Sequence, residues 1–224
     1  MIEVENSKET IGYGKKLEGM KQELKDMSNE KLNFYEEWNK IVELSQNYSR
    51  VLGVEFKIDK NEIEGKEEVQ ATEEVKATLI HEIDMILKNI YKRAARHFVK
   101  DILQNSFNFS RFTDSSEIIE DVSVYLLPYG FVYALAKDLK TKMSQIRKLF
   151  SEILKLKTVR NKSLQVSRIS FMSKYALARG TIRPLLDEFI QNSMEIIKAN
   201  NYATDEIEGF IEVFKALIAY SKAK

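Results

Sequence analysis

Apolar residues recur every three to five positions through most of this chain, which is the spacing expected of amphipathic α-helices. From roughly Lys15 to Leu52 the pattern predicts one long helix, or two shorter helices separated near Ser28-Asn29. From about Thr72 to Asn105 it predicts a second long helix with a single apolar face. The low content of eight glycines and two prolines agrees with long helices joined by short loops. We therefore predict an all-α fold.

The stretch between these two long helices, Gly53–Gln70, differs in composition and is the best linker candidate, because two glycines flank an acidic run. A short apolar alternation from Val54 to Ile58 could be extended, but a lone strand has no evident partner. We therefore divide the chain into residues 1–70, an acidic helical N-terminal extension plus linker, and residues 71–224, a helical bundle domain with a basic face.

Start and stop signals divide the remaining chain into shorter helices. A third helix should start near Asp114, be buried because it is apolar almost all round, and be kinked or broken at Pro128 and Gly130. Four short helices should follow, over residues 144–157, 163–179, 184–200 and 204 to the last residue. The predicted architecture is a helical bundle of short C-terminal helices with two or three longer N-terminal helices.

Particular residues account for these boundaries. Ser144 is the expected N-cap of the first short helix, because its hydroxyl can accept a hydrogen bond from a free backbone amide. Gly180 should end the second helix in the left-handed conformation. Pro184 suits the first turn of the third helix, and Thr204 should open the fourth.

The residues that could carry catalysis are few. The chain has no cysteine and only two histidines, His81 and His97. His97 and Asp101 are four residues apart, which favours a hydrogen bond on a helix surface over a metal site that would need further ligands. We therefore expect no enzyme activity, no catalytic residues, no metal site and no cofactor. No long uncharged apolar run predicts a membrane span, and the absence of cysteine fits a reducing cytoplasm.

Charge is strongly segregated along the chain. The segment Lys137–Arg183 carries 13 basic residues and only two acidic ones, Asp138 and Glu152, although the formal net charge of the whole chain is only +1. An ordinary soluble surface intersperses both signs of charge. A basic segment of this kind is typical of a protein that binds a phosphate backbone.

The first short helix concentrates this charge on one side. Ser144, Lys148, Ser151 and Lys155 recur at helical spacing opposite an apolar stripe that contains Ile146 and Ile153. Such a strip of hydroxyl and ammonium groups suits a phosphodiester backbone, although any single lysine can equally belong to an ordinary solvated face. The residues proposed to bind RNA are Lys142, Ser144, Gln145, Arg147, Lys148, Ser151, Lys155, Lys157, Arg160, Lys162, Arg168, Lys174 and Arg179.

The next short helix places aromatic residues between basic ones. Arg168, Phe171, Tyr175 and Arg179 share one face of this helix, while Val166 and its neighbours take another. Stacking on unpaired bases would require this arrangement. Aromatic residues more often fill the core, so we expect Phe171 and Tyr175 to be buried, with stacking as the alternative.

Three segments in the C-terminal part of the chain carry motifs of one known family. The first, Thr141–Phe150 (TKMSQIRKLF), is similar to the signature T-x-S-Q-I-R-K-hydrophobic of the small subunit of type III-A CRISPR effector (Csm) complexes. Lys174–Arg179 resembles a later segment with Tyr175 and Ala176 in swapped order, and Phe214–Tyr220 resembles the family's ending with Lys215 in place of glutamate.

This resemblance implies a small non-catalytic helical bundle, present in several copies along a guide-RNA complex. There it would contact the guide and target RNA without reading sequence, with other subunits of the complex as partners and with self-association left open. A protein that lines a duplex selected by base pairing should bind backbone and shape. We also expect the last helix, which is apolar nearly all round, to serve both the core and a subunit interface.

Two other functions stay open at this point. One is a helical protein–protein adaptor whose basic face meets an acidic protein partner. The other is a helical metal- or nucleotide-dependent hydrolase, which the scarcity of histidine and glycine motifs disfavours. The leading hypothesis is a non-catalytic structural subunit of a cytoplasmic type III-A CRISPR ribonucleoprotein that contacts the RNA backbone without sequence specificity.

Overall fold

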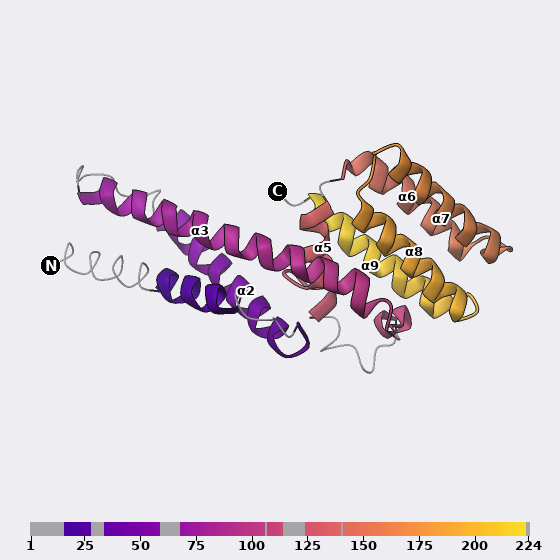
Figure 1. Cartoon of the computed structure of the whole chain (residues 1–224), viewed down its shortest axis with the longest axis horizontal. Helices are drawn as coiled ribbons and strands as arrows, with labels where there is room; N and C mark the ends of the chain where they lie inside the picture. The colour runs from indigo at the N-terminus through magenta and orange to yellow at the C-terminus, as the bar shows by residue number, and fades with distance from the viewer. Residues whose placement is uncertain are drawn as a thin grey trace. The chain divides into compact units, whose positions relative to one another are not determined.

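A computed structural model describes residues 16–27, 34–58, 68–105, 107–113, 124–139 and 141–222 of this chain, without the side chains of residues 34–37 and 51–76. Every regular element in these residues is a helix, which confirms the predicted all-α class (Figure 1). After a helix at residues 16–27, the elements are α2 (Phe34–Ile58), α3 (Glu68–His97), η1 (Phe98–Ile102), η2 (Phe109–Phe112), α5 (Phe131–Leu139), α6 (Met143–Leu154), η3 (Lys155–Lys157), α7 (Lys162–Ala178), α8 (Pro184–Ala199) and α9 (Thr204–Lys222).

The chain forms two compact units, Met1–Ile90 and Tyr91–Lys224, and α3 contributes residues to both. In the first unit, an ion pair between Lys21 and Glu82 joins the helix at residues 16–27 to α3. Tyr48 of α2 donates a hydrogen bond to Asp84 of α3 over 3.1 Å. The most deeply buried large side chains of this unit are Leu17, Leu24, Trp38, Ile41, Ile83 and Ile90. The division into domains at residue 70 stays a prediction.

Part of the predicted linker is helical. Helix α2 continues through Gly53 as far as Ile58, so the suggestion of a linker, or of an extended segment, was wrong for these residues. A single glycine costs a helix only about 1 kcal/mol, and no proline interrupts this stretch. The rest of the predicted linker up to residue 67, the break near Ser28-Asn29 and the start signal at Asp114 lie outside the described residues.

Helix α9 is the centre of the second unit (yellow in Figure 1) and packs against α5, α6, α8, η2 and η3. Apolar residues occupy nearly every side of α9 and are buried by the helices around it. The core that they form is rich in aromatic rings. The fully buried phenylalanines of this unit are Phe98, Phe109, Phe189, Phe210 and Phe214. Such rings supply a large buried apolar area and prefer tilted or edge-to-face pairs, as Phe109 and Phe210 adopt at 63°.

Two contacts attach η2 closely to α9. The buried Glu206 carboxylate accepts a hydrogen bond from the backbone amide of Phe109 over 2.7 Å. One turn further along α9, the Cα of Gly209 lies directly against the Phe109 carbonyl group, so that a Cβ atom at this position would overlap with it. Glycine at position 209 therefore permits this close approach of the two backbones.

The short C-terminal helices largely begin and end where the signals predict. Gly180 has φ 64°, and its amide donates to Leu177 O over 2.8 Å while Thr181 N donates to Ala176 O over 2.9 Å, which together close the end of α7. Pro184 begins α8. The predicted cap at Ser144 was wrong, because α6 starts one residue earlier and Lys142 is its N-cap.

The predicted second long helix ends in a π-turn, η1, rather than in regular α-helix. Leu103 N donates to Phe98 O instead of Val99 O, which leaves the Val99 carbonyl without its α-helical partner. Asn192 of α8 supplies the missing donor through its side-chain amide over 2.7 Å. The widened turn therefore gives η1 a polar attachment to α8.

Candidate nucleic-acid interface

Helix α6 has the two faces that its sequence predicts. Ile146, Leu149 and Ile153 are buried against the bundle. The opposite side is exposed and consists of Ser144, Arg147, Lys148, Ser151 and Lys155. Gln145 lies at the edge of this face and is half-buried. The amphipathic helix thus presents hydroxyl and cationic groups to solvent from a rigid support.

Several cations of the basic segment have no carboxylate partner among the described residues. They include Lys142, Arg147 and Lys148 at α6, and Arg160 in the loop before α7. All four are exposed. Their charges are therefore available to an external anion, and a polyanion would release condensed counterions on binding them.

Other proposed contact residues are already paired. Lys157 lies 3.0 Å from Glu208 of α9, and Lys174 lies 3.8 Å from the buried Asp187 of α8. Lys162 is half-buried and donates to the backbone oxygen of Tyr202 over 3.3 Å. These cations attach the basic segment to α8 and α9 and contribute less free charge than the sequence suggests.

Glu152 joins the exposed faces of α6 and α7. Its side chain is only 10% exposed and accepts a hydrogen bond from Lys155 over 2.6 Å. Gln165 and Arg168 of α7 reach the same carboxylate over 3.2 Å and 3.3 Å. The bond from Lys155, with help from Gln165 and Arg168, lowers the pKa of Glu152 below its ordinary value. One buried carboxylate therefore holds the basic faces of two helices side by side.

The outer face of α7 differs from its prediction. Phe171 is 70% exposed and Tyr175 is 54% exposed, so the expectation that both belong to the core was wrong. The buried side of α7 is taken by Gln165, Val166, Ile169 and Ser173 instead. Because α7 packs against α6, α8 and η3, its fourth side stays open to solvent.

The exposed rings of α7 form an ordered group. The ring centroids of Phe171 and Tyr175 are 6.4 Å apart, and the ring planes differ by 17°. The Arg179 guanidinium lies 5.5 Å from the centroid of the Tyr175 ring, and it donates to the Tyr175 hydroxyl over 3.2 Å. Leu164, one of the residues that the sequence reasoning missed, extends the same face and is 66% exposed. Its spacing of seven residues from Phe171 was the signal.

Arg183 was also missed among the candidate contacts. It is exposed and is the N-cap residue of α8, directly after the basic segment's second helix. His97 and Asp101 form the expected surface pair over 2.7 Å. Within the part of the chain that the structure describes, no three His, Asp or Glu side chains gather as a metal site would require. No described helix has the length and apolar character of a membrane span.

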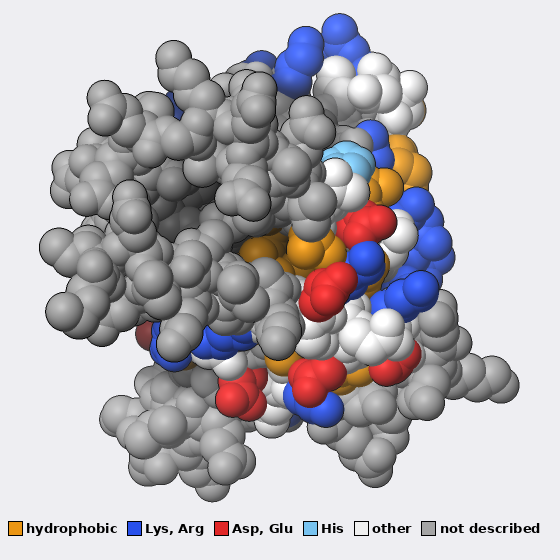
Figure 2. All heavy atoms as spheres, turned by 90° about the vertical axis from the view of Figure 1, so that its left-hand side faces the viewer, with side chains coloured by type: hydrophobic (Ala, Val, Ile, Leu, Met, Phe, Trp, Pro, Cys, Tyr) orange, Lys and Arg blue, Asp and Glu red, His pale blue; other side chains and the backbone are white. Residues whose placement is uncertain are grey.

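The two kinds of charged surface are easily distinguished. Figure 2 shows a face on which basic and acidic side chains of the described residues lie next to one another. In the first unit, Lys21 is accordingly paired with Glu82. The exposed side of α6, in contrast, carries Arg147 and Lys148, and the one carboxylate of this helix, Glu152, is buried. This side of α6 therefore has the net charge that an ordinary mixed surface lacks.

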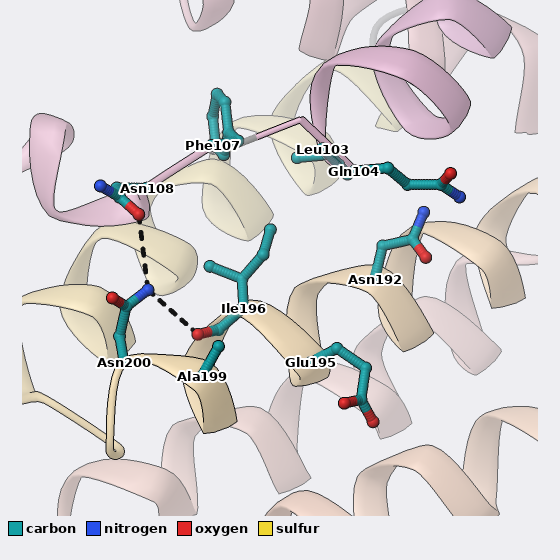
Figure 3. Close-up of a pocket in the computed structure, with 9 residues that line it drawn as sticks. All are labelled: Leu103, Gln104, Phe107, Asn108, Asn192, Glu195, Ile196, Ala199 and Asn200. Atoms are coloured by element: carbon teal, nitrogen blue, oxygen red, sulfur yellow. Dashed lines mark hydrogen bonds between the residues drawn. The ribbon is translucent and has the colours of Figure 1, made fainter.

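A surface pocket of about 560 Å³ lies elsewhere in the second unit (Figure 3). One wall is formed by Leu103, Gln104, Phe107 and Asn108, and the other by α8 and Asn200. Asn200 donates to Asn108 over 3.4 Å and to Ile196 O over 3.1 Å, which joins the two walls. No lysine or arginine lines the pocket, and none of the proposed contact residues lies in it.

Helices α5 to α9 thus form a helical bundle with unpaired cations on α6 and exposed aromatic rings on α7, which defines a helical protein with a basic, partly aromatic face. Residues 131–224, which span these five helices, match the family model Csm2 Type III-A. This match confirms the resemblance carried by the three motifs, all of which lie within the matched segment. Residues 1–130 lie outside the match. No curated protein and no solved structure matches the chain significantly.

Proposed function

We propose that this chain is a non-catalytic subunit of a type III-A CRISPR ribonucleoprotein that contacts the backbone of guide and target RNA without reading sequence. The observation that carries the proposal is the exposed basic side of α6, where Lys142, Arg147 and Lys148 have no carboxylate partner among the described residues. It lies within the segment that matches the family model. Charged and hydroxyl groups of this kind bind phosphates and position a protein on RNA without specifying bases.

We propose guide RNA, target RNA and the other subunits of the complex as the partners of this chain. We propose the cytoplasm as its location. Base pairing between guide and target supplies sequence specificity in such complexes, so a subunit along the duplex needs only backbone and shape contacts. Specific contacts to base edges would require polar groups that reach into a groove. The cations of α6 that have no carboxylate partner among the described residues are exposed to solvent, which suits contact with phosphates.

The salt dependence of binding provides the first test. Each phosphate contact with single-stranded RNA lowers the slope of log affinity against log salt by about 0.7. Contacts from the α6 cations Lys142, Arg147 and Lys148 together with Arg160 therefore predict a slope of about −3. Fluorescence anisotropy of the full chain with a labelled single-stranded RNA between 50 and 300 mM salt measures this slope. Binding that does not depend on salt would contradict the proposal.

A charge reversal provides the second test. Arg147→Glu/Lys148→Glu should weaken binding to every RNA sequence equally and should leave helicity unchanged, because both side chains are exposed. Lys155 is left intact because a glutamate there would lie against the Glu152 carboxylate. Lys40→Glu/Lys88→Glu is the matched control, since it changes the net charge equally at exposed lysines of the first unit.

Equal affinities of Arg147→Glu/Lys148→Glu and the wild-type chain would contradict RNA binding by α6. The basic face would then fit the alternative, an adaptor that meets an acidic protein. The expected lack of catalysis is tested separately by incubating the purified chain with labelled RNA and Mg²⁺ or Mn²⁺. Cleavage that persists through purification and is lost in His97→Ala would show that the chain is an enzyme.

A further inference from the structure

Three of the large apolar side chains that are exposed within the described residues, Leu164, Phe171 and Tyr175, lie on one face of α7. Isolated exposed apolar residues are normal on protein surfaces, but a contiguous group marks a site of interaction. Phe171, Tyr175 and Arg179 follow one another at intervals of four residues, so they form a continuous column along the helix. A molecule that binds this column must cover its exposed aromatic rings.

The charge around the column indicates the chemistry of that occupant. Arg168 and Lys174 lie on either side of it and Arg179 at its end, and all three are exposed. Arg168 pairs with the buried Glu152 over 3.3 Å and Lys174 with the buried Asp187 over 3.8 Å, whereas Arg179 has no carboxylate partner among the described residues. A purely apolar protein surface would leave the Arg179 guanidinium without an anionic partner. A polyanion with planar rings satisfies both the charges and the aromatic faces.

The geometry of the rings favours stacking. The two rings are nearly parallel, and the guanidinium of Arg179 lies near the Tyr175 ring at a distance typical of cation–π contact. Proteins that bind single-stranded nucleic acid combine cations along the backbone with aromatic rings on which successive bases stack. Bases inside a duplex are already stacked on one another, so their faces are not available to such a surface.

We propose that Phe171 and Tyr175, together with Arg179, form a platform on which unpaired bases of RNA stack, while the basic side of α6 holds the adjacent backbone. This inference rests on the proposed RNA-binding function and adds to it a preference for unpaired nucleotides. The Glu152 contacts with Lys155 and Arg168 keep the two helices together, so one RNA strand can reach both faces. The platform is sequence-tolerant because every base has an aromatic face.

The test compares three ligands with the full chain by fluorescence anisotropy at 50 mM salt. The ligands are a single-stranded RNA of mixed sequence, the same strand in a perfect RNA duplex, and an abasic ribose–phosphate strand of equal length. Phe171→Ala/Tyr175→Ala should weaken single-strand binding at least about tenfold, because aromatic truncation removes roughly fivefold to a hundredfold per stacked base. Binding of the duplex and of the abasic strand should be unchanged.

Two matched variants identify the cause of any loss. Phe171→Leu/Tyr175→Leu keeps an apolar surface without aromatic rings and should lose single-strand affinity as the alanine variant does. Arg147→Glu/Lys148→Glu should weaken binding of all three ligands, because it acts on phosphates. The circular dichroism spectrum of each variant should equal that of the wild type, since the replaced side chains are exposed.

The remaining outcomes separate the platform from the proposed function. If the alanine variant binds all three ligands like the wild type, the platform is wrong and backbone binding by α6 stands. Full affinity in the leucine variant, or an equal loss for all three ligands, would also overturn stacking. A changed sedimentation coefficient with unchanged RNA binding would assign the rings to contact between copies of the chain. If the wild-type chain binds none of the ligands, both proposals fail.

Discussion

Helices α7 and α9 carry apolar residues on almost all sides, yet the bundle treats them differently. In α9, Phe210, Phe214 and Leu217 are completely buried. In α7, Phe171 and Tyr175 are mostly exposed. Helix α9 packs against α5, α6, α8, η2 and η3, whereas α7 packs against α6, α8 and η3. The number of neighbouring helices, rather than the apolar content of each helix, decides which aromatic rings are buried.

This difference corrects one expectation from the sequence. The last helix contributes to the core as expected, with Ile218 and Tyr220 half-buried, and its role in a subunit interface stays a prediction. The open apolar surface is on α7, among cations. Apolar residues that no neighbouring helix covers therefore give a better indication of an interaction surface than apolar content alone.

The largest expected effect is the difference in unfolding free energy between alanine variants of Phe214 and Phe171. Phe214→Ala removes a fully buried ring from the centre of α9 and should lower the free energy of unfolding by about 3–5 kcal/mol. Phe171→Ala truncates an exposed ring and should change it by less than about 0.5 kcal/mol. Urea unfolding of the full chain, followed by circular dichroism, measures both values. Similar losses of unfolding free energy in the two variants would mean that the Phe171 ring is buried in solution.

Local rules predicted much of the C-terminal bundle. The apolar stripe of α6, the left-handed Gly180 and the first-turn Pro184 each depend on residues within a few positions of one another. The T-x-S-Q-I-R-K motif lies on the same helix, and its family resemblance is confirmed by the match. Such short-range patterns are visible in one sequence because helix periodicity and capping act over one or two turns.

Features that join distant segments were not predictable in this way. The π-turn at η1 needs Asn192, far along the chain, to satisfy the Val99 carbonyl. The pairing of Arg168 with Glu152 depends on how α6 and α7 pack, so the free charge of the basic segment was overestimated. The exposure of Phe171 follows from the neighbours that α7 has, which no periodicity within α7 reveals.

The next largest effect should come from Gly209 in α9. Gly209→Ala places a Cβ atom against the Phe109 carbonyl and should cost about 1–3 kcal/mol, because η2 must move away from α9. The Glu206 bond to Phe109 opposes that movement. Gly19→Ala is the control, because Gly19 lies in a helix with open space around it. This substitution should stabilise the chain by about 0.5–1 kcal/mol. A neutral Gly209→Ala would contradict the close packing of η2 on α9.

The smallest effect concerns the carboxylate that attaches α7 to α6. The pKa of Glu152 is lowered by its hydrogen bond with Lys155, with further help from Gln165 and Arg168. The folded chain therefore holds a proton on this group less tightly than the unfolded chain does. Its contribution to stability is complete above pH 4.5, the ordinary value for the group, and is lost as pH falls through the lowered pKa.

Glu152→Gln should therefore destabilise the chain by about 1 kcal/mol at pH 7, because its hydrogen bonds lose their charge. The difference from the wild type should shrink as pH falls below 4.5. Glu212→Gln is a close control, since Glu212 pairs with Lys215 at the same spacing and distance, 2.6 Å, but its side chain is 44% exposed. Thermal unfolding of both variants between pH 3 and pH 7 measures the difference. If Glu152→Gln and Glu212→Gln follow the same pH profile, Glu152 does not hold α7 in place, and the open face of α7 must be maintained by its other contacts with α6, α8 and η3.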